Sequence, residues 1–313
     1  MVLDLFSNLE EIGRLIGNTP ILRLSRVVSS KSNVASIYLK LEYMNPGGSH
    51  KDRISYYMLK DAIESGKLRE GGCVVEVSSG NTALSLAWMC VRLGLKAVFI
   101  AEADISPVKM ALLRLLGVEV VKVDVSGIGD VDPRFLRARE LEAKFNGLFI
   151  NQFSNEANFR AHYETTAREI VDQLNGRVDA FVMGVGTGGT IAGVGKYLKE
   201  KLGRDVLVVG VVPKGSSIIH GKPVGGEYID GLAKNVIPEL FLKYRGYIDR
   251  VVEVSEGDSV GMVKMLALKE GLFVGPSTGA AVFEALKVAE ELGSGRNVVT
   301  IAADSLVRYP YLL

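Results

Sequence analysis

The sequence contains little cysteine and little histidine. Its two cysteines lie in apolar surroundings, Cys73 in the strand-like run CVVEV and Cys90 in the helix-like run WMCVRLG. We expect both to be small buried hydrophobic residues rather than partners in a disulfide. His50, His162 and His220 are scattered and lack the spacing of metal ligands. Neither a disulfide framework nor a metal site is therefore expected.

The sequence also lacks an excess of charge and a long apolar run. Its 37 basic and 36 acidic residues give a net charge of +1, which provides no basic field for nucleic acid or for an anionic membrane. No stretch approaches the roughly 20 apolar residues of a membrane span. The start, MVLDLFSNLEEIGRL, carries acidic residues where a secretory signal would be basic. We expect a cytoplasmic protein with neither membrane nor nucleic acid as a partner.

Short β-branched runs alternate with amphipathic segments along the 313 residues. This alternation predicts βαβ units and an α/β fold with mostly parallel sheets. The length suits two domains, which we predict to divide near residue 150, as 1–150 and 151–313. The predicted strands are 37–42, 73–77, 97–101, 118–123, 148–150, 180–185, 206–212 and 297–302, and the predicted helices include 51–66, 82–94, 106–117 and 190–203.

Four glycine- or serine-rich segments each follow a strand and precede a helix, so we expect all four to face one crevice. The first, NPGGSHKDR (45–53), places Lys51 at the opening of a helix. A helix N-terminus and partial burial both lower the pKa of a lysine and make its amine nucleophilic. The alternative is an ordinary solvated charge beside Asp52 and Arg53.

The second and fourth segments suit either ligand binding or helix capping. VSSGNT (77–82) offers backbone N–H groups and small polar side chains that can hold a substrate carboxylate. Its alternative role is a helix cap formed by Ser79, Asn81 or Thr82. In GPSTGAA (275–281), Ser277 or Thr278 can likewise cap the next helix or bind a ligand.

The third segment, GVGTGGTIAG (184–193), is typical of a phosphate-binding loop. Its glycines allow close approach of the backbone, and its threonines add hydroxyl donors at a helix start. Gly184, Gly186 and Gly189 also fit G-x-G-x-x-G, but a dinucleotide site needs an acid after the next strand. Because Pro213 and Lys214 stand there instead, a single phosphate is favoured.

A nucleophilic lysine together with a separate monophosphate site is the minimum set of groups that binds pyridoxal phosphate. The whole chain then resembles the cysteine synthase and cystathionine β-synthase family of fold-type II pyridoxal-phosphate enzymes. The resemblance rests on IGNTPILRL (16–24), NPGGSHKDR, SSGNT, NQFSNEANFRAHYETTAREI (151–170), GTGGT and GPSTGA.

The resemblance implies a two-domain fold like that of the tryptophan synthase β chain, in which each domain is a mostly parallel sheet flanked by helices. The smaller N-terminal domain would carry the substrate loop, and the larger C-terminal domain would carry the phosphate loop. Roughly the first 40 residues can pack on the other domain in such a fold. A homodimer is also implied by the resemblance.

The resemblance further implies a role for each matching residue. Lys51 would bind the cofactor covalently and move the α-proton, Asn81 would contact the 3′ oxygen of the cofactor, and Ser277 would meet its pyridine nitrogen. The cofactor phosphate would be bound by Gly186, Thr187, Gly188, Gly189 and Thr190. The substrate carboxylate would be held by the segment Ser78, Ser79, Gly80, Asn81 and Thr82 together with Gln152.

The implied reaction makes L-cysteine from O-acetylserine or O-phosphoserine and sulfide, through an aminoacrylate intermediate. A serine beside the pyridine nitrogen, instead of a carboxylate, does not force protonation of the ring and so favours loss of a β-substituent. We also expect one of the lysines in or beside the glycine-rich loop (215–233), Lys214, Lys222 or Lys234, to accept a phosphate leaving group.

Some positions depart from the family pattern, namely Ala83, His50 and EYIDGLAKNVIP (227–238), and the ending AADSLVRY (302–309) looks more like that of a cystathionine synthase. Synthesis of cystathionine from serine and homocysteine is therefore an alternative with the same chemistry.

Two alternatives belong to other classes. One is a non-catalytic partner protein that binds pyridoxal phosphate, and the other is a nucleotide-binding oxidoreductase.

Overall fold

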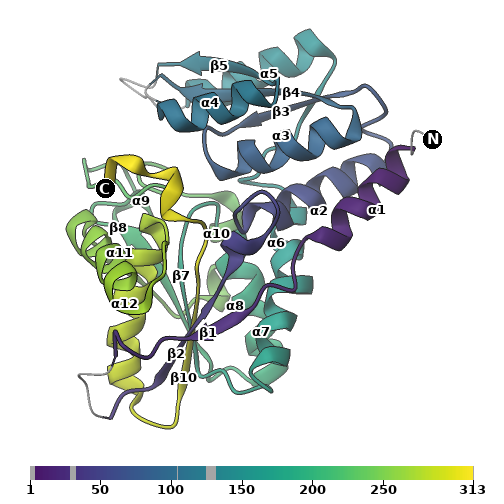
Figure 1. Ribbon diagram of the computed structural model, residues 1–313. Helices are drawn as coiled ribbons and strands as arrows, with labels where there is room; N and C mark the ends of the chain where they lie inside the picture. The colour runs from purple at the N-terminus through teal and green to yellow at the C-terminus, as the bar shows by residue number, and fades with distance from the viewer. Residues whose placement is uncertain (1–3, 29–32, 104, 125–131, 313) are drawn as a thin grey trace. The chain divides into compact units, whose positions relative to one another are not determined.

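The computed structural model describes residues 4–28, 33–103, 105–124 and 132–312. The chain divides into two compact units. Unit 1 consists of residues 1–16 and 45–158, and unit 2 consists of residues 17–44 and 159–313. Each unit contains its own sheet with flanking helices (Figure 1). The predicted α/β class with mostly parallel sheets is therefore confirmed.

Unit 1 is built on a four-stranded parallel sheet in the order β5-β4-β3-β6. Its strands are β3 (Cys73–Val77), β4 (Lys96–Glu102), β5 (Glu119–Val123) and β6 (Leu148–Phe149). Its helices are α1 (Leu5–Leu15), α2 (Lys51–Glu64), α3 (Asn81–Leu93), α4 (Pro107–Leu115) and α5 (Pro133–Phe145). Apolar residues of β3 and β4 pack against Ala138 and Leu141 of α5, so this helix covers one face of the sheet.

Unit 2 is built on a six-stranded sheet in the order β1-β2-β10-β7-β8-β9. Only β1 runs antiparallel to its neighbour in the described sheet. The strands are β1 (Ile21–Arg23), β2 (Ser36–Lys40), β7 (Ala180–Gly184), β8 (Leu207–Pro213), β9 (Arg250–Val254) and β10 (Asn297–Ile301). Residues 17–44 thus add an edge hairpin to a sheet whose other strands lie more than 130 residues further along.

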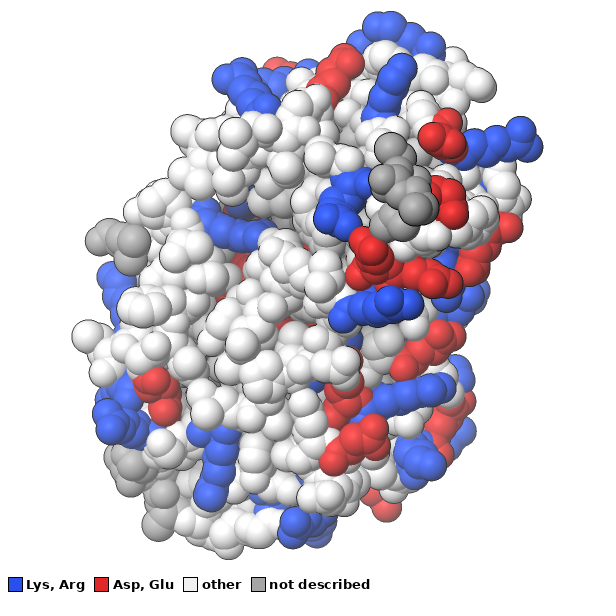
Figure 2. All heavy atoms as spheres, turned by 45° about the vertical axis from the view of Figure 1, so that its right-hand side comes forward, with Lys and Arg blue, Asp and Glu red and all other residues white. Residues whose placement is uncertain are grey.

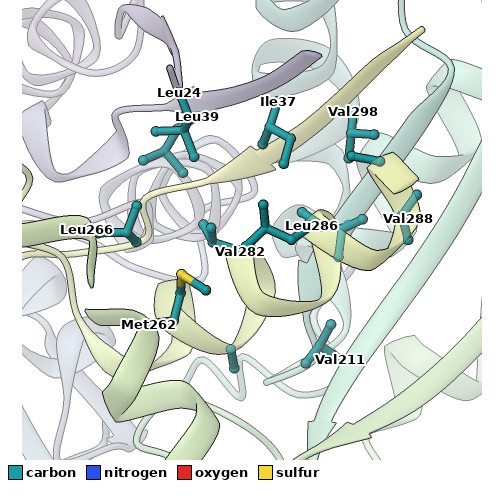
Figure 3. Close-up of a cluster of buried hydrophobic side chains, with 14 of the residues drawn as sticks. Leu24, Ile37, Leu39, Val211, Met262, Leu266, Val282, Leu286, Val288 and Val298 are labelled. Atoms are coloured by element: carbon teal, nitrogen blue, oxygen red, sulfur yellow. The ribbon is translucent and has the colours of Figure 1, made fainter. Parts of the chain in front are cut away.

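The helices of unit 2 cover both faces of this sheet. They are α7 (Ala167–Gln173), α8 (Gly189–Leu202), α9 (Ser217–His220), α10 (Glu239–Lys243), α11 (Glu256–Glu270) and α12 (Pro276–Leu292), and α6 (Glu156–Ala161) spans the division between the units. On one face, Val282 and Val288 of α12 pack with Ile37, Val211 and Val298 of the strands (Figure 3). A second cluster, which includes residues of α7 and α8, fills the other face.

Every predicted strand has a counterpart in the structure, but the sequence did not reveal β1 and β9. Both lie at the edges of the unit 2 sheet, where one side has no neighbouring strand among the described residues. Edge strands are short or rich in charge, and β1 has three residues while β9 contains Arg250 and Glu253. Their hydrophobic signal is correspondingly weak. Cys73 and Cys90 are buried free thiols, as expected.

Charged side chains of both signs lie on the surface that Figure 2 draws. Lys and Arg side chains lie interleaved with Asp and Glu side chains on that face, as the near balance of the two charges leads one to expect. Among the described residues, no helix has the length and apolar character needed to span a membrane. The same part of the chain holds no cluster of three or more metal-binding side chains.

Helix α11 provides a matched test of the unit 2 core. Leu266 is fully buried, with 0% exposure, whereas Leu268 on the same helix is 86% exposed. We expect Leu266→Ala to lower the free energy of unfolding by about 2–5 kcal/mol, because it leaves a cavity. Leu268→Ala should change it by less than about 0.5 kcal/mol. Urea unfolding followed by far-ultraviolet circular dichroism measures both, and equal effects would contradict the assigned core.

Candidate active site

Lys51 is the first residue of α2 and is half-buried. Its backbone N–H lies 3.3 Å from the hydroxyl oxygen of Ser49, which accepts from it. The next residue, Asp52, is fully buried and accepts hydrogen bonds from the Gly47 N–H at 2.5 Å and from the Trp88 indole N–H at 3.1 Å. Because Trp88 belongs to α3, these bonds fix the loop before Lys51 against the helix that follows the SSGNT segment.

Ser78 caps helix α3. Its hydroxyl oxygen accepts the backbone N–H groups of Gly80 at 3.3 Å and of Ala83 at 3.2 Å. The cap expected from Ser79, Asn81 or Thr82 is thus supplied by a different residue. The first turn of a helix leaves backbone N–H groups without intrahelical partners, and the N-terminal end of the helix carries partial positive charge. The start of α3 therefore has the electrostatic character of an anion-binding site.

Thr82 and Gln152 are in direct contact although 70 residues separate them in the sequence. The Thr82 hydroxyl donates to the Oε1 of Gln152 at 2.7 Å. The Nε2 of Gln152 donates to the carbonyl oxygen of Val77 at 3.2 Å, and its backbone carbonyl accepts from Asn158 at 2.8 Å. Both predicted substrate residues are buried. The structure thus joins two parts of the predicted substrate site, which are distant in the sequence, into one hydrogen-bonded cluster.

Glu76 supports this cluster from strand β3 and was missed at the level of sequence. Its carboxyl group accepts the backbone N–H of Val77 at 2.8 Å and that of Gln152 at 3.1 Å. Burial raises the pKa of Glu76 to about 8, while hydrogen bonds from the backbone of Gln152, Val77 and Asn151 act in the opposite direction. An acid inside the otherwise apolar run CVVEV is the signal that points to a special role.

The predicted phosphate loop of unit 2 connects β7 to α8, and it is closely packed. Gly188 has φ +86°, a left-handed conformation that favours glycine, and a Cβ there would lie 2.7 Å from the Phe241 backbone nitrogen. A Cβ on Gly186 would lie 2.5 Å from the carbonyl oxygen of Gly231. Helix α8 begins at Gly189, so the loop ends at a helix N-terminus suited to a phosphate.

A buried histidine lies behind this loop. The Nε2 of His162 is 3.0 Å from the Thr190 hydroxyl oxygen, and its Nδ1 is 2.9 Å from the Thr166 hydroxyl oxygen. His162 and Thr166 lie four residues apart in a π-helical turn, so they share one side of it. The sequence showed this histidine only as one that lacks metal-ligand spacing. Its contact with Thr190 places it in the support of the phosphate loop.

Ser277 is the second residue of α12 and lies next to the glycine-rich loop. A Cβ on Gly231 would lie 3.8 Å from both the Cβ and the hydroxyl oxygen of Ser277. Helix α12 has no side-chain cap, and the Thr278 hydroxyl instead accepts the Ala303 N–H at 3.0 Å. Gly231 thus lies against both Gly186 and Ser277, which brings the predicted phosphate loop and the predicted pyridine partner to one place within unit 2.

The loop that contains Gly231 is held to the sheet beside the phosphate loop. The Ala233 N–H donates to the Val185 carbonyl at 2.8 Å, and the Ser216 hydroxyl donates to the Ala233 carbonyl at 2.7 Å. The three loop lysines differ in environment. Lys214 and Lys222 are exposed, whereas Lys234 is half-buried and its carbonyl accepts the Ser217 N–H at 2.7 Å.

Unit 1 therefore carries Lys51, the SSGNT segment and Gln152, and unit 2 carries the predicted phosphate loop and Ser277. The sequence profile of the pyridoxal-phosphate dependent enzymes matches residues 12–304 of this chain. The chain belongs to this family. Within it, the chain is of the cysteine synthase and cystathionine β-synthase type, and its cofactor is pyridoxal phosphate.

Individual relatives agree with this assignment over nearly the full length. A cysteine synthase of Staphylococcus aureus is 38% identical over 301 residues, which cover 96% of this chain and 95% of the relative. The crystal structure of an O-ureido-L-serine synthase has a TM-score of 0.88 at 35% identity, covering 95% of this chain and 92% of the other. An O-acetylserine dependent cystathionine β-synthase from Helicobacter pylori has a TM-score of 0.87 at 34% identity, with 96% of each chain covered.

The residues present fit this cofactor. The backbone of Gly231 and Phe241 packs against Gly186 and Gly188, which holds the loop in one conformation, and the loop ends at the N-terminus of α8, where backbone N–H groups can bind a phosphate. A lysine at the first position of a helix supplies the amine that a pyridoxal aldehyde requires.

Glu76 predicts a pH dependence of stability. A group whose pKa is raised on folding, here from 4.5 to about 8, stabilises the folded state below pH 4.5, and this contribution is lost as the pH rises to about 8. Glu76→Gln cannot ionise and removes this contribution. We expect the free energy of unfolding of the wild type, relative to that of Glu76→Gln, to fall across this pH range. Denaturant titrations at several pH values measure the difference, and a constant difference would contradict the raised pKa.

Gly186 tests the packing of the phosphate loop. In Gly186→Ala, the new methyl group meets a backbone carbonyl oxygen that can move only with its loop. Overpacking of this kind costs about 1–3 kcal/mol, so the Kd for pyridoxal phosphate should rise roughly 5- to 100-fold. Gly261→Ala in α11 is the control, because a Cβ there enters open space. Cofactor titration of the two apoproteins makes the comparison, and equal Kd values would argue against a role for this loop.

Proposed function

We propose that this protein makes L-cysteine from O-acetyl-L-serine or O-phospho-L-serine and sulfide. The contact between Thr82 and Gln152 carries this proposal, because it joins two predicted carboxylate-binding elements at the start of a helix. A side-chain amide has two N–H donors. The Nε2 of Gln152 gives one of them to Val77, which leaves the second for the carboxylate of an amino acid. The similarity to a cysteine synthase supports the same substrate class.

Each group of this site has a proposed task. The Lys51 amine would hold the cofactor covalently and, when free, would accept the α-proton of the substrate. The loop 186–190 binds the cofactor phosphate, Asn81 contacts its 3′ oxygen, and the Ser277 hydroxyl meets its ring nitrogen. Pyridoxal phosphate supplies an electron sink that stabilises the negative charge left on the α-carbon. A neutral serine beside the ring limits this stabilisation, which favours loss of the β-substituent over side reactions.

A second candidate is β-replacement with a thiol in place of sulfide. The similarity to an O-acetylserine dependent cystathionine β-synthase favours it, as does the ending 302–309. Turnover of each donor with sulfide and with homocysteine, measured in parallel, separates the two candidates. A strong preference for homocysteine would replace the first proposal with the second.

A homodimer stays a prediction from the family resemblance, and a cytoplasmic location stays a prediction from the sequence. The mass of the purified holoprotein in solution, measured by light scattering, tests the first of them.

A visible absorption spectrum tests the main proposal. The purified protein should show a yellow cofactor band that shifts when one donor is added, from O-phosphoserine, O-acetylserine and serine in turn. The matched control is Lys51→Ala, which can bind the cofactor only without the covalent bond, so its activity should fall by at least about 10³-fold. A yellow wild-type protein unmoved by all three donors would contradict β-replacement. Unchanged turnover in Lys51→Ala would overturn the role of the lysine.

Lys234 tests the choice of leaving group. Among the three loop lysines it is the half-buried one, and it directly follows the residue that bonds to Val185. If it binds a phosphate leaving group, Lys234→Ala should lower kcat/KM for O-phosphoserine about 3- to 10-fold and leave O-acetylserine unchanged. The exposed Lys222, changed to alanine, is the control. Equal losses with both donors would argue against phosphate recognition by Lys234.

A further inference from the structure

Glu76 is an acid in the middle of a buried parallel strand. Its side chain is completely buried, and among the described residues it accepts hydrogen bonds from backbone N–H groups rather than from a cation. Removing a carboxyl group from water costs free energy unless hydrogen bonds replace the lost water. An apolar side chain would avoid this cost but would leave the N–H of Gln152 without its acceptor. The bonds that Glu76 makes therefore indicate what it does.

These bonds lie where strand pairing between β3 and β6 ends. The last regular bond of this pair runs from the Ile150 N–H to the Val75 carbonyl at 3.0 Å. Asn151 then adopts a left-handed conformation, with φ +51°, and turns the chain away. The next acceptor on β3, the Val77 carbonyl, is bonded by the side chain of Gln152, and the Gln152 backbone N–H is bonded by Glu76.

At this point side chains replace the regular strand partners of the Gln152 N–H and of the Val77 carbonyl. These two bonds fix the direction of the Gln152 side chain. The backbone N–H of Gln152 is held by Glu76 and its carbonyl by Asn158, so the chain is fixed on both sides of its Cα. The side chain can then meet both the Val77 carbonyl and the Thr82 hydroxyl. Without the bond from Glu76, the backbone N–H of Gln152 would itself compete for the Val77 carbonyl, as regular strand pairing requires.

We infer that Glu76 is a positioning residue for substrate recognition, which keeps the Gln152 amide directed toward the carboxylate of the amino-acid substrate. The inference rests on the proposed function, since it assigns Gln152 to the substrate carboxylate. Glu76 acts through Gln152 and has no part in the covalent steps at Lys51. Its loss should therefore weaken binding of the amino acid more than it slows turnover.

Glu76→Gln tests this role with little change of shape. Two backbone N–H groups point at the two carboxyl oxygens, each of which can accept a hydrogen bond whether or not the group is protonated, so an amide must oppose one of these N–H groups with its own NH₂ group. Glu142→Gln is a matched control in the same unit, because Glu142 accepts the backbone N–H of Phe149 at 2.8 Å, three residues before Gln152. In this control the amide oxygen can still accept the Phe149 N–H while its NH₂ group faces Arg139, so the same substitution is made in this segment without a change at Gln152.

In Glu76→Gln we expect KM for the donor amino acid to rise about 3- to 10-fold while kcat changes less than about twofold. The Kd for pyridoxal phosphate should not change. The affinity ratio of L-serine over L-serinamide, which lacks the carboxylate, should fall by the same factor as KM rises, and Glu142→Gln should leave all these values unchanged. A fall in kcat with constant KM, or equal effects in the two variants, would overturn the inference.

Amide hydrogen exchange provides a test without turnover. In the wild type, the Gln152 N–H should be protected as strongly as the N–H of Ile150, which belongs to the sheet, and in Glu76→Gln its exchange should become at least about tenfold faster. Rapid exchange of the Gln152 N–H in the wild type would overturn the inference even if the variant does not fold. Protection of this N–H in a protein that turns over none of the donors would mean that the proposed function has failed while the bond to Glu76 stands.

Discussion

Parallel pairing of strands is the constraint on which both halves of this molecule depend. In a parallel sheet every strand ends at the same edge, so each connection to the following helix begins there. β3 leads through Ser78–Gly80 into α3, and β7 leads through the glycine loop into α8. Each helix start then offers backbone N–H groups and partial positive charge. The two anions of the proposed reaction, a carboxylate and a phosphate, are assigned to these two helix starts.

The side chains behind each helix start determine how well that start can bind an anion. Behind α3, Glu76 and Asn158 hold the backbone of Gln152, and Thr82 holds its side chain. Behind α8, His162 contacts Thr190. In both places a buried polar side chain has its partners within the protein. Such groups cost free energy if a partner is lost, so they enforce one arrangement of the loop instead of several.

Local features of the site could be predicted because each is contained in a short stretch of sequence. A strand, a glycine loop and a helix start follow one another within 180–203, so the phosphate loop needed no long-range information. The contacts of Glu76 and His162 could not be predicted in this way. Glu76 bonds to a residue 76 positions away, and His162 to one 28 positions away. A buried acid in an apolar run gave a signal, but the sequence contains nothing that names its partner.

The sequence by itself determined the α/β class, the family and the cofactor, because periodicity and ordered motifs are local properties of the chain. Tertiary structure decided that residues 17–44 join the sheet of unit 2, since β2 pairs with β10 at a separation of 261 residues. It also decided that Ser78 caps α3 and that Glu76 accepts the N–H of Gln152 where the pairing of β3 with β6 ends. These outcomes depend on which backbone groups meet when distant segments pack, and only the folded chain brings those groups within hydrogen-bonding distance.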